Sequence, residues 1–427
     1  MKYFKKPFEH TLVVRNLLKW AVLAIAVSTI TGSFVALFLY LLDVATQYRW
    51  QHPWLLFLLP IAGICIHFLY KLYGKNADKG NNLIIDEIHE PGGGVPARMA
   101  PFVLVATVIT HLFGGSAGRE GTAVQIGGSM ANFIGKQLRL SKADIRILLM
   151  MGIAAGFGAV FGTPVAGAVF AVEVLIVGKI KYDALVPCLI AAVFADMVCS
   201  AWGIRHTHYT ISFTGSVPAY LSFLHFDFLL FFKVIIAGVV FGLSGYLFAN
   251  VSHQLKALAV KYISVPWFIP AVGGVAIIGL TYLSGTTDYL GLGVVSEHAN
   301  GISIVNAFHE GGVTTWSWLW KLVFTVVTLS LGFKGGEVTP LFFIGAALGN
   351  TIAIILGAPV DLFAGLGFIA VFAGATNTPI ACTLMGIELF GGDNVIYFAV
   401  ACFTAYYCSG RSGIYSAQRF PANNVKQ

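Results

Sequence analysis

Charged side chains are scarce in this sequence of 427 residues. Lysine and arginine number 26 and aspartate and glutamate 19, so that 11% of the residues are charged and 57% are hydrophobic. Soluble domains contain roughly 25% charged residues. A chain with only 11% charged residues cannot cover a globular surface with polar groups. This composition excludes a water-soluble enzyme, a nucleic-acid-binding domain and a disordered scaffold, and it places the chain in a lipid bilayer.

The sequence also has long stretches without a single charged residue. A helix that crosses a bilayer needs about 20 apolar residues, and only helices or closed barrels satisfy their backbone polar groups in lipid. The stretches lack the alternation of polar and apolar residues that barrel strands require. They therefore predict an all-α polytopic membrane protein. They are Ala21–Leu42, Ile147–Val172, Val234–Val251, Ile263–Thr287, Val338–Val360, Leu362–Ile387 and Val395–Gly410.

Patterns that bind metals or form disulfides are missing from the sequence. The six cysteines have no CxxC spacing, and the 11 histidines do not follow the spacing of metal ligands. We expect no metal site and no cofactor. Neither Glu120 nor Glu337 is accompanied by a nucleophile or a paired carboxylate, which argues against an intramembrane enzyme. A sodium-coupled transporter would need more Asp and Ser facing a cavity.

Basic residues gather at the N-terminus, where Lys2, Lys5, Lys6, Arg15 and Lys19 precede the first apolar stretch. Under the positive-inside rule this arrangement predicts a cytoplasmic N-terminus, here in a plasma (inner) membrane. The net charge of +7 thus has an explanation that needs no nucleic acid.

Two lysines within the chain, Lys321 and Lys334, are expected to reach toward a membrane interface rather than line a pore.

Glycine is abundant, with 48 residues, and its clusters reveal an internal repeat. Matched features recur at an offset of 215 to 217 residues, which predicts a duplicated unit. Duplicated units with glycine-interrupted segments are typical of transporters, whose broken helices point their N-termini at a common site. Such N-termini favour an anion. The matched pairs are Gly162–Pro164 with Asn377–Pro379, Glu173 with Glu388, and Gly118–Gly121 with Gly335–Val338.

The repeat divides the chain into four predicted parts. They are a basic cytoplasmic segment (1–19), a first transmembrane repeat (20–200), an inter-repeat loop (201–227) and a second transmembrane repeat (228–420).

Glu173 and Glu388 are expected to accept hydrogen bonds from backbone N–H groups of the opposite repeat.

Glu120 is the acidic residue most closely associated with a helix start. It follows a glycine-rich run and adjoins an expected helix over Thr122–Ile134, so its carboxylate would occupy the position of an anion. There it would compete with a transported ion and, once protonated, carry a proton. The alternative is an ordinary carboxylate that caps the helix.

The segment Gly118–Gly128 closely resembles the gating-glutamate motif of the CLC family of chloride channels and anion/proton antiporters. Gly335–Pro340 and Gly410–Ala417 resemble two further segments of that family, in the same order along the chain. The resemblance covers roughly residues 20 to 420. It implies two inverted-topology repeats of tilted and broken helices, a homodimer, and Glu120 as the gating glutamate. The cytoplasmic regulatory domains of some family members are not expected.

Three departures from the family pattern resemble its fluoride/proton branch. Asn81 stands at the place of an anion-coordinating serine, Glu337 and Thr339 change the GGIFAP segment, and Val174 replaces an internal proton glutamate. An asparagine offers two N–H donors, which suits the small and strongly hydrated fluoride ion. Glu337 either handles protons or is a structural carboxylate bound to a helix terminus.

We therefore expect an antiporter that exports cytoplasmic fluoride in exchange for protons, and no enzymatic activity. The alternative is a chloride/proton antiporter or chloride channel of the same fold. The expected anion-binding residues are Asn81, Val338, Thr339, Tyr415, Gly118 and Gly121, with Tyr415 implied by the resemblance as the inner-gate tyrosine.

Overall fold

The computed structural model describes residues 6–214 and 227–420, with side chains from residue 14 onward. These residues form helices joined by turns and loops, without a regular strand. Six of the helical stretches are long and apolar enough to cross a membrane. The prediction of an all-α membrane protein is confirmed. The helices are α1 (Lys6–Gln51), α2 (Leu59–Leu69), α3 (Asn81–His89), α4 (Met99–Leu112), α5 (Glu120–Gln137), α6 (Lys142–Phe161), α7 (Pro164–Glu173), α8 (Leu185–Ala201), α9 (Phe228–Tyr262), α10 (Phe268–Ser284), α11 (Ser317–Ser330), α12 (Val338–Leu356), α13 (Val360–Thr376), α14 (Pro379–Phe390) and α15 (Val395–Cys408).

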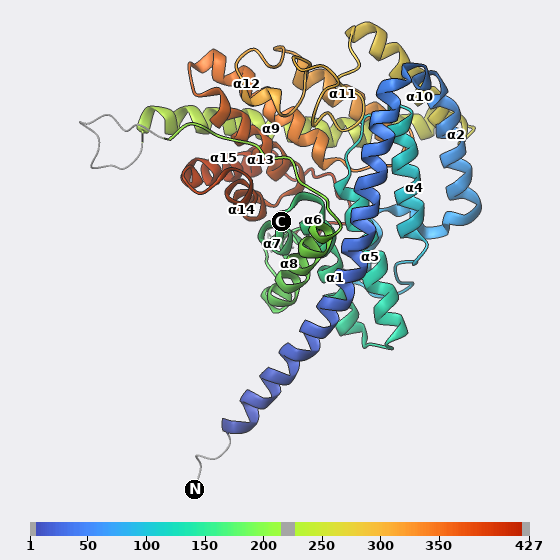
Figure 1. Cartoon of the computed structure of the whole chain (residues 1–427), viewed down its shortest axis with the longest axis vertical. Helices are drawn as coiled ribbons and strands as arrows, with labels where there is room; N and C mark the ends of the chain where they lie inside the picture. The colour runs from blue at the N-terminus through green and yellow to red at the C-terminus, as the bar shows by residue number, and fades with distance from the viewer. Residues whose placement is uncertain (1–5, 215–226, 421–427) are drawn as a thin grey trace, which may run out of the picture.

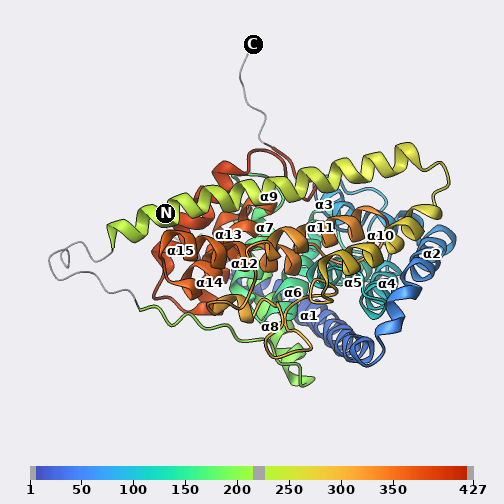
Figure 2. The same cartoon turned by 90° about the horizontal axis from the view of Figure 1, so that it is seen from above.

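The two longest helices frame the molecule. The first turns of α1 extend beyond the body of the protein (Figure 1). Helix α9 runs along one face and crosses both halves, with α12–α15 toward one end and α2–α5 toward the other (Figure 2). The shorter helices between them pack against one another at the centre.

The two halves of the chain pack their central helices in the same way. In the first half α5 packs on α6 with Gly127 against Gly152, and in the second half α12 packs on α13 with Gly345 against Gly367. A Cβ atom at any of these glycines would collide with the backbone of the facing helix. Small residues allow such close approach between membrane helices. The shared packing confirms the internal repeat.

The Thr-Pro motifs mark a sharp turn that both halves share. Helix α6 is capped at its C-terminus by Gly162 (φ +70°) and helix α13 by Asn377 (φ +57°), both in the left-handed conformation. A left-handed residue closes a helix, and a proline fits the first position of the next one. Pro164 and Pro379 accordingly begin α7 and α14.

Two buried or half-buried glutamates tie the halves together at these turns. Glu173 accepts hydrogen bonds from the backbone N–H of Ile380 (3.1 Å) and Ala381 (2.8 Å) at the start of α14. Glu388 accepts two of 2.8 Å from Val165 and Ala166 at the start of α7. Each carboxylate caps a helix of the opposite repeat, as the sequence predicts.

Replacing Glu388 with glutamine should destabilise the fold without touching Glu120. An amide presents one oxygen to two N–H groups and turns its own N–H₂ toward a donor, which leaves a buried group unsatisfied at a cost of about 1–3 kcal/mol. We expect thermal unfolding in detergent at a lower temperature for Glu388→Gln, while Glu310→Gln, an exposed position, stays at the wild-type value. Equal unfolding temperatures for the two variants would contradict this role.

The segment between the repeats is only partly described. Residues 202–214 of the predicted loop 201–227 have no regular structure, and residues 215–226 lie outside the described residues, as do 1–5 of the basic N-terminal segment. The described part of the loop packs on the second half, where the backbone N–H of Ser212 (2.6 Å) and of Phe213 (3.1 Å) donate to Asp361. This contact attaches the described part of the loop to the first turn of α13.

Candidate functional site

Helices α5 and α12 begin side by side at the centre of the protein. Just ahead of them, the backbone N–H of Gly118 donates to the carbonyl of Gly336 (2.6 Å), and that of Gly336 donates to the carbonyl of Gly118 (2.8 Å). A Cβ atom on Gly118 would lie 2.9 Å from the Gly336 carbonyl oxygen and 2.7 Å from Glu120 Oε2. Only glycine therefore fits here, and the fit brings two helix N-termini to one point.

The carboxylate of Glu120 lies at the N-terminus of α12. Glu120 is fully buried, and its Oε2 accepts from the backbone N–H of Thr339 (3.0 Å) and of Arg119 (3.1 Å). The Thr339 hydroxyl donates to Oε1, and Arg119 Nε lies 3.7 Å from the same oxygen. Helix N-termini bind anions, so Glu120 occupies an anion-binding position with its own side chain.

A second carboxylate lies near the N-terminus of α5. Measured from the position that a Cβ of Gly121 would take, Asn81 Nδ2 is 3.1 Å away and Glu337 Oε2 is 3.7 Å away. Asn81 is the first residue of α3, and its buried Oδ1 finds no hydrogen-bond partner in the described residues. Glu337 is half-buried and, within the same residues, accepts no hydrogen bond from another residue. Both side chains thus adjoin α5 with unused hydrogen-bonding capacity.

Tyr415 approaches the site from the C-terminal segment. Its ring is buried edge-on to Phe170 (6.4 Å between centroids) and lies within electrostatic range of Glu120 and Glu337. The segment is held because the backbone N–H of Ala417 donates to Asn82 Oδ1 (3.0 Å).

Further along the segment, outside the membrane-spanning helices, Arg419 hydrogen-bonds to Glu90 and lowers the pKa of that carboxyl. The segment after α15 is therefore attached to α3 and to the residue that follows it, which fixes the approach of Tyr415.

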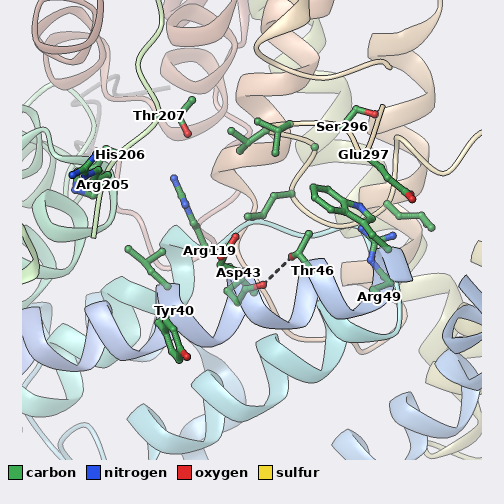
Figure 3. A pocket seen from close by; sticks show the side chains of 18 of the residues that line it. Tyr40, Asp43, Thr46, Arg49, Arg119, Arg205, His206, Thr207, Ser296 and Glu297 are labelled. Atoms are coloured by element: carbon green, nitrogen blue, oxygen red, sulfur yellow. Dashed lines mark hydrogen bonds between the residues drawn. The ribbon is translucent and has the colours of Figure 1, made fainter. Parts of the chain in front are cut away.

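A cavity of about 390 Å³ opens at the C-terminal end of α1. We call it the wide cavity. Arg119 reaches into it, with Arg205 and His206 on one wall and Arg49 and Glu297 on the other (Figure 3). Further lining residues are Asp43, Thr46, Thr207, Asp288 and Ser296. Arginines and acidic residues share the walls, and Arg119 connects the cavity directly to Glu120.

A much smaller cavity, here called the neck, continues from the wide cavity toward Glu120. The neck shares Arg119, His206 and Thr207 with the wide cavity and adds Thr339 and Phe342. Its volume is about 10 Å³, which is near the minimum for one water-sized particle. The ring of Phe342 stacks on Phe368 (3.9 Å between centroids) beside it. The path from the cavity to the buried carboxylate is therefore narrow and partly aromatic.

The structure brings the predicted site residues together from four segments. Gly118, Glu120 and Thr339 are in direct contact, Asn81, Gly121 and Glu337 form a second group, and Val338 is buried as the first residue of α12. Helix α5 begins at Glu120 rather than at Thr122 and ends at Gln137, because the glutamate itself takes the first helical position.

The prediction for Lys321 is wrong. Lys321 is fully buried and donates from Nζ to the carbonyls of Tyr289 (3.0 Å) and Gly291 (2.8 Å). It therefore fixes a loop that lines the wide cavity. Lys334 forms an ion pair with Asp78 beside a surface cavity. The sequence around a single lysine in an apolar segment does not indicate which carbonyls will accept its hydrogen bonds.

The sequence prediction missed the residues between the wide cavity and Glu120, namely His206, Thr207 and Phe342. They come from the inter-repeat loop and from α12, which both follow Glu120 in the chain by more than 80 residues. The concentration of Thr, Ser and His in residues 201–223 was the available signal, but nothing in the sequence places this loop over the site.

In this all-helical membrane protein, repeated broken helices place a carboxylate at a helix N-terminus. This fold and this site together define an ion-transport protein. Comparison with known proteins gives the family. Residues 62–410 match the family model for the voltage gated chloride channel. The chain belongs to this family, the CLC family, as the resemblance in its motifs predicts, and it is therefore a transporter rather than an enzyme.

Relatives and solved structures agree with this assignment. The chain is 48% identical, over 98% of its own length and 90% of the relative's, to a chloride/fluoride channel protein of Pseudomonas syringae pv. tomato. It superposes on the crystal structure of a CLC-type fluoride/proton antiporter with a TM-score of 0.88 and 36% identity, over 95% and 98% of the two chains. A slow cyanobacterial Cl⁻/H⁺ antiporter shares the fold, with a TM-score of 0.76 at 19% identity over 93% and 96%.

Proposed function

We propose that the protein is a secondary-active antiporter that exports cytoplasmic fluoride in exchange for protons. The observation that carries the proposal is the carboxylate of Glu120, which takes hydrogen bonds from the backbone and hydroxyl of Thr339 at a helix N-terminus. An anion that enters this position must displace the carboxylate, and a proton on the carboxylate releases it. One side chain thus alternates between the two ions, which couples their movements.

Fluoride is favoured over chloride by the donors around the site. The amide of Asn81 and the hydroxyl of Thr339 supply strong donors for a small anion whose dehydration is costly. The similarity to a fluoride/proton antiporter supports the same choice. The rival is a chloride/proton antiporter or chloride channel, because the bacterial relative is named for both anions.

Glu337 fits a role in proton handling better than a structural one. A structural carboxylate near a helix terminus would accept backbone hydrogen bonds, as Glu173 does. Within the described residues Glu337 accepts none from another residue and faces the space beside Gly121 and Asn81. With Val174 in place of an internal proton glutamate, Glu337 supplies a second carboxylate next to the path of Glu120.

The proposal includes an orientation and an assembly. With the N-terminus of α1 in the cytoplasm of a cell with an inner membrane, the wide cavity faces the outside. The protein works as a homodimer with one path in each subunit, which the resemblance to the family implies.

Purified protein in liposomes provides the test. Fluoride and chloride efflux are measured with ion-selective electrodes while a pH electrode follows proton uptake in the same sample. Fluoride efflux with stoichiometric proton movement and little chloride efflux is the expected result. Comparable chloride efflux would favour the rival, and fluoride efflux without proton movement would contradict antiport.

A further inference from the structure

We propose that His206 and Asp196 form a proton-loading pair, which takes protons from the wide cavity and passes them to Glu120. The inference rests on the proposed function, since it assigns a route to the proton that the antiporter exchanges. The pair joins two elements, because Asp196 belongs to α8 and His206 to the loop that follows it. His206 Nε2 lies 3.6 Å from Asp196 Oδ1.

Both facing atoms are buried and unused. Neither His206 Nε2 nor Asp196 Oδ1 has a hydrogen-bond partner in the part of the chain that the structure describes. The two side chains are 16% and 26% exposed. Buried polar atoms normally have partners, and two that face each other across 3.6 Å become an ion pair when the imidazole takes a proton. Asp196 is thus placed to form an ion pair with a protonated His206.

The ring of His206 is held in place by a glycine. Gly162 ends α6 with φ +70°, and a Cβ atom there would lie 2.6 Å from His206 Cδ2. The imidazole therefore packs flush against the backbone at the end of α6. A fixed ring, rather than a freely rotating one, suits a group that receives a proton on one side and releases it on the other.

His206 lies between the wide cavity and the site of Glu120. His206 lines both the wide cavity and the neck, and Figure 3 shows it on the cavity wall that faces Arg119. The neck also reaches Thr339, which holds Glu120. Because the neck has room for about one water-sized particle, protons reach the buried carboxylate poorly by bulk diffusion, and a titratable group at the entrance overcomes that restriction.

The proposed step is a balanced proton transfer. The neutral imidazole of His206 accepts a proton from water in the wide cavity, and the carboxylate of Asp196 stabilises the imidazolium. The proton then passes through the neck to Glu120, which becomes a neutral acid and releases Thr339, while His206 returns to its neutral form. Imidazole commonly shuttles protons in proteins because one ring nitrogen can accept a proton while the other releases one.

Other charges surround the pair and set the conditions for loading. Arg119 opposes a positive charge on His206, while Asp196 favours it. The titratable and charged groups around the pair lie on several elements. They are Arg119 ahead of α5, Arg205 and Tyr209 in the same loop, Cys199 on α8, Glu388 on α14, which interacts with Asp196, and Asp43 and Glu297 across the wide cavity.

The test compares His206→Gln, Asp196→Asn and the control His208→Gln, an exposed histidine of the same loop. Proton-coupled fluoride efflux from liposomes is measured with equal pH on both sides, from pH 5 to 8. We expect His206→Gln to be slower than wild type by about tenfold or more at pH 7.5, with the difference shrinking at pH 5, where water itself supplies protons. Asp196→Asn should change in the same direction, and His208→Gln should match wild type.

Several outcomes would overturn the inference. Wild-type rates in His206→Gln at pH 7.5 would do so, and so would a loss of equal size at every pH, which indicates a packing role beside Gly162. Asp196→Asn leaves the histidine in place, so it decides the matter if His206→Gln does not fold. The number of protons per fluoride should stay unchanged, because Glu120 is intact. If wild-type protein moves fluoride without protons, the proposed function fails; if only the variants behave normally, this inference fails alone.

Discussion

Proton movement should vanish when Glu120 is replaced with glutamine, while fluoride continues to move down its gradient. Glutamine keeps the size of the side chain but cannot take up or release a proton at any pH of the assay. A group that transfers protons contributes about 10²–10⁴-fold to its step, so fluoride-driven proton uptake in liposomes should fall by at least that lower figure, to background. Fluoride pumping against its gradient should be lost with it.

The contacts of Glu120 explain why we expect fluoride flux to survive in Glu120→Gln. The carboxylate is attached to α12 by charge-assisted hydrogen bonds from the backbone and hydroxyl of Thr339, and it lies beside the Arg119 guanidinium. Charge-assisted bonds are roughly twice as strong as neutral ones. A neutral amide competes less well for the helix N-terminus, so an anion displaces it more readily.

The exposed Glu310 offers a matched control, because Glu310→Gln removes one carboxylate without reaching the site. It should transport both ions at wild-type rates. Persistent uphill fluoride transport by Glu120→Gln on a pH gradient would show that another group carries the proton. Elution of each variant as a single species in detergent separates loss of coupling from loss of folding.

The position of Glu120 was predictable because its signal is local. A carboxylate within a glycine-rich run at the start of a helix can do little except lie at helix N-termini, and the internal repeat supplies the second terminus at a fixed offset. Glu173 and Glu388 were predictable for the same reason, since each recurs nine residues after its Thr-Pro turn. In each case the repeat converts a local pattern into a long-range contact.

Contacts without a matching partner in the other repeat could not be predicted. Lys321 donates to the carbonyls of Tyr289 and Gly291, and His206 Nε2 lies 3.6 Å from Asp196 Oδ1. These contacts depend on how a loop folds back over the helices, for which composition and periodicity carry no information. Burial of a lysine in a membrane protein is costly, so it persists only where nearby carbonyls happen to receive it.

Replacing Asn81 with serine should lower the preference for fluoride over chloride by about tenfold to a hundredfold. The amide Nδ2 of Asn81 faces the start of α5 near Gly121, and serine has one shorter donor in place of two N–H groups. A hydrogen bond to a charged partner is worth about 1.5–3 kcal/mol, and each 1.4 kcal/mol is a factor of ten. Fluoride loses more than chloride, because its smaller size makes incomplete coordination more costly.

Asn76→Ser serves as the control, because Asn76 is exposed five residues earlier in the chain. Fluoride and chloride efflux are compared in the same liposomes for wild type and both variants. Unchanged selectivity in Asn81→Ser would show that Asn81 does not coordinate the anion, and a uniform slowing of both anions would indicate a structural role at the start of α3. Proton coupling should persist in Asn81→Ser, because the substitution leaves Glu120, the proposed proton carrier, intact. The proposed function assigns selectivity to a side chain on α3 and coupling to one on α5, so we expect the two substitutions to separate these properties.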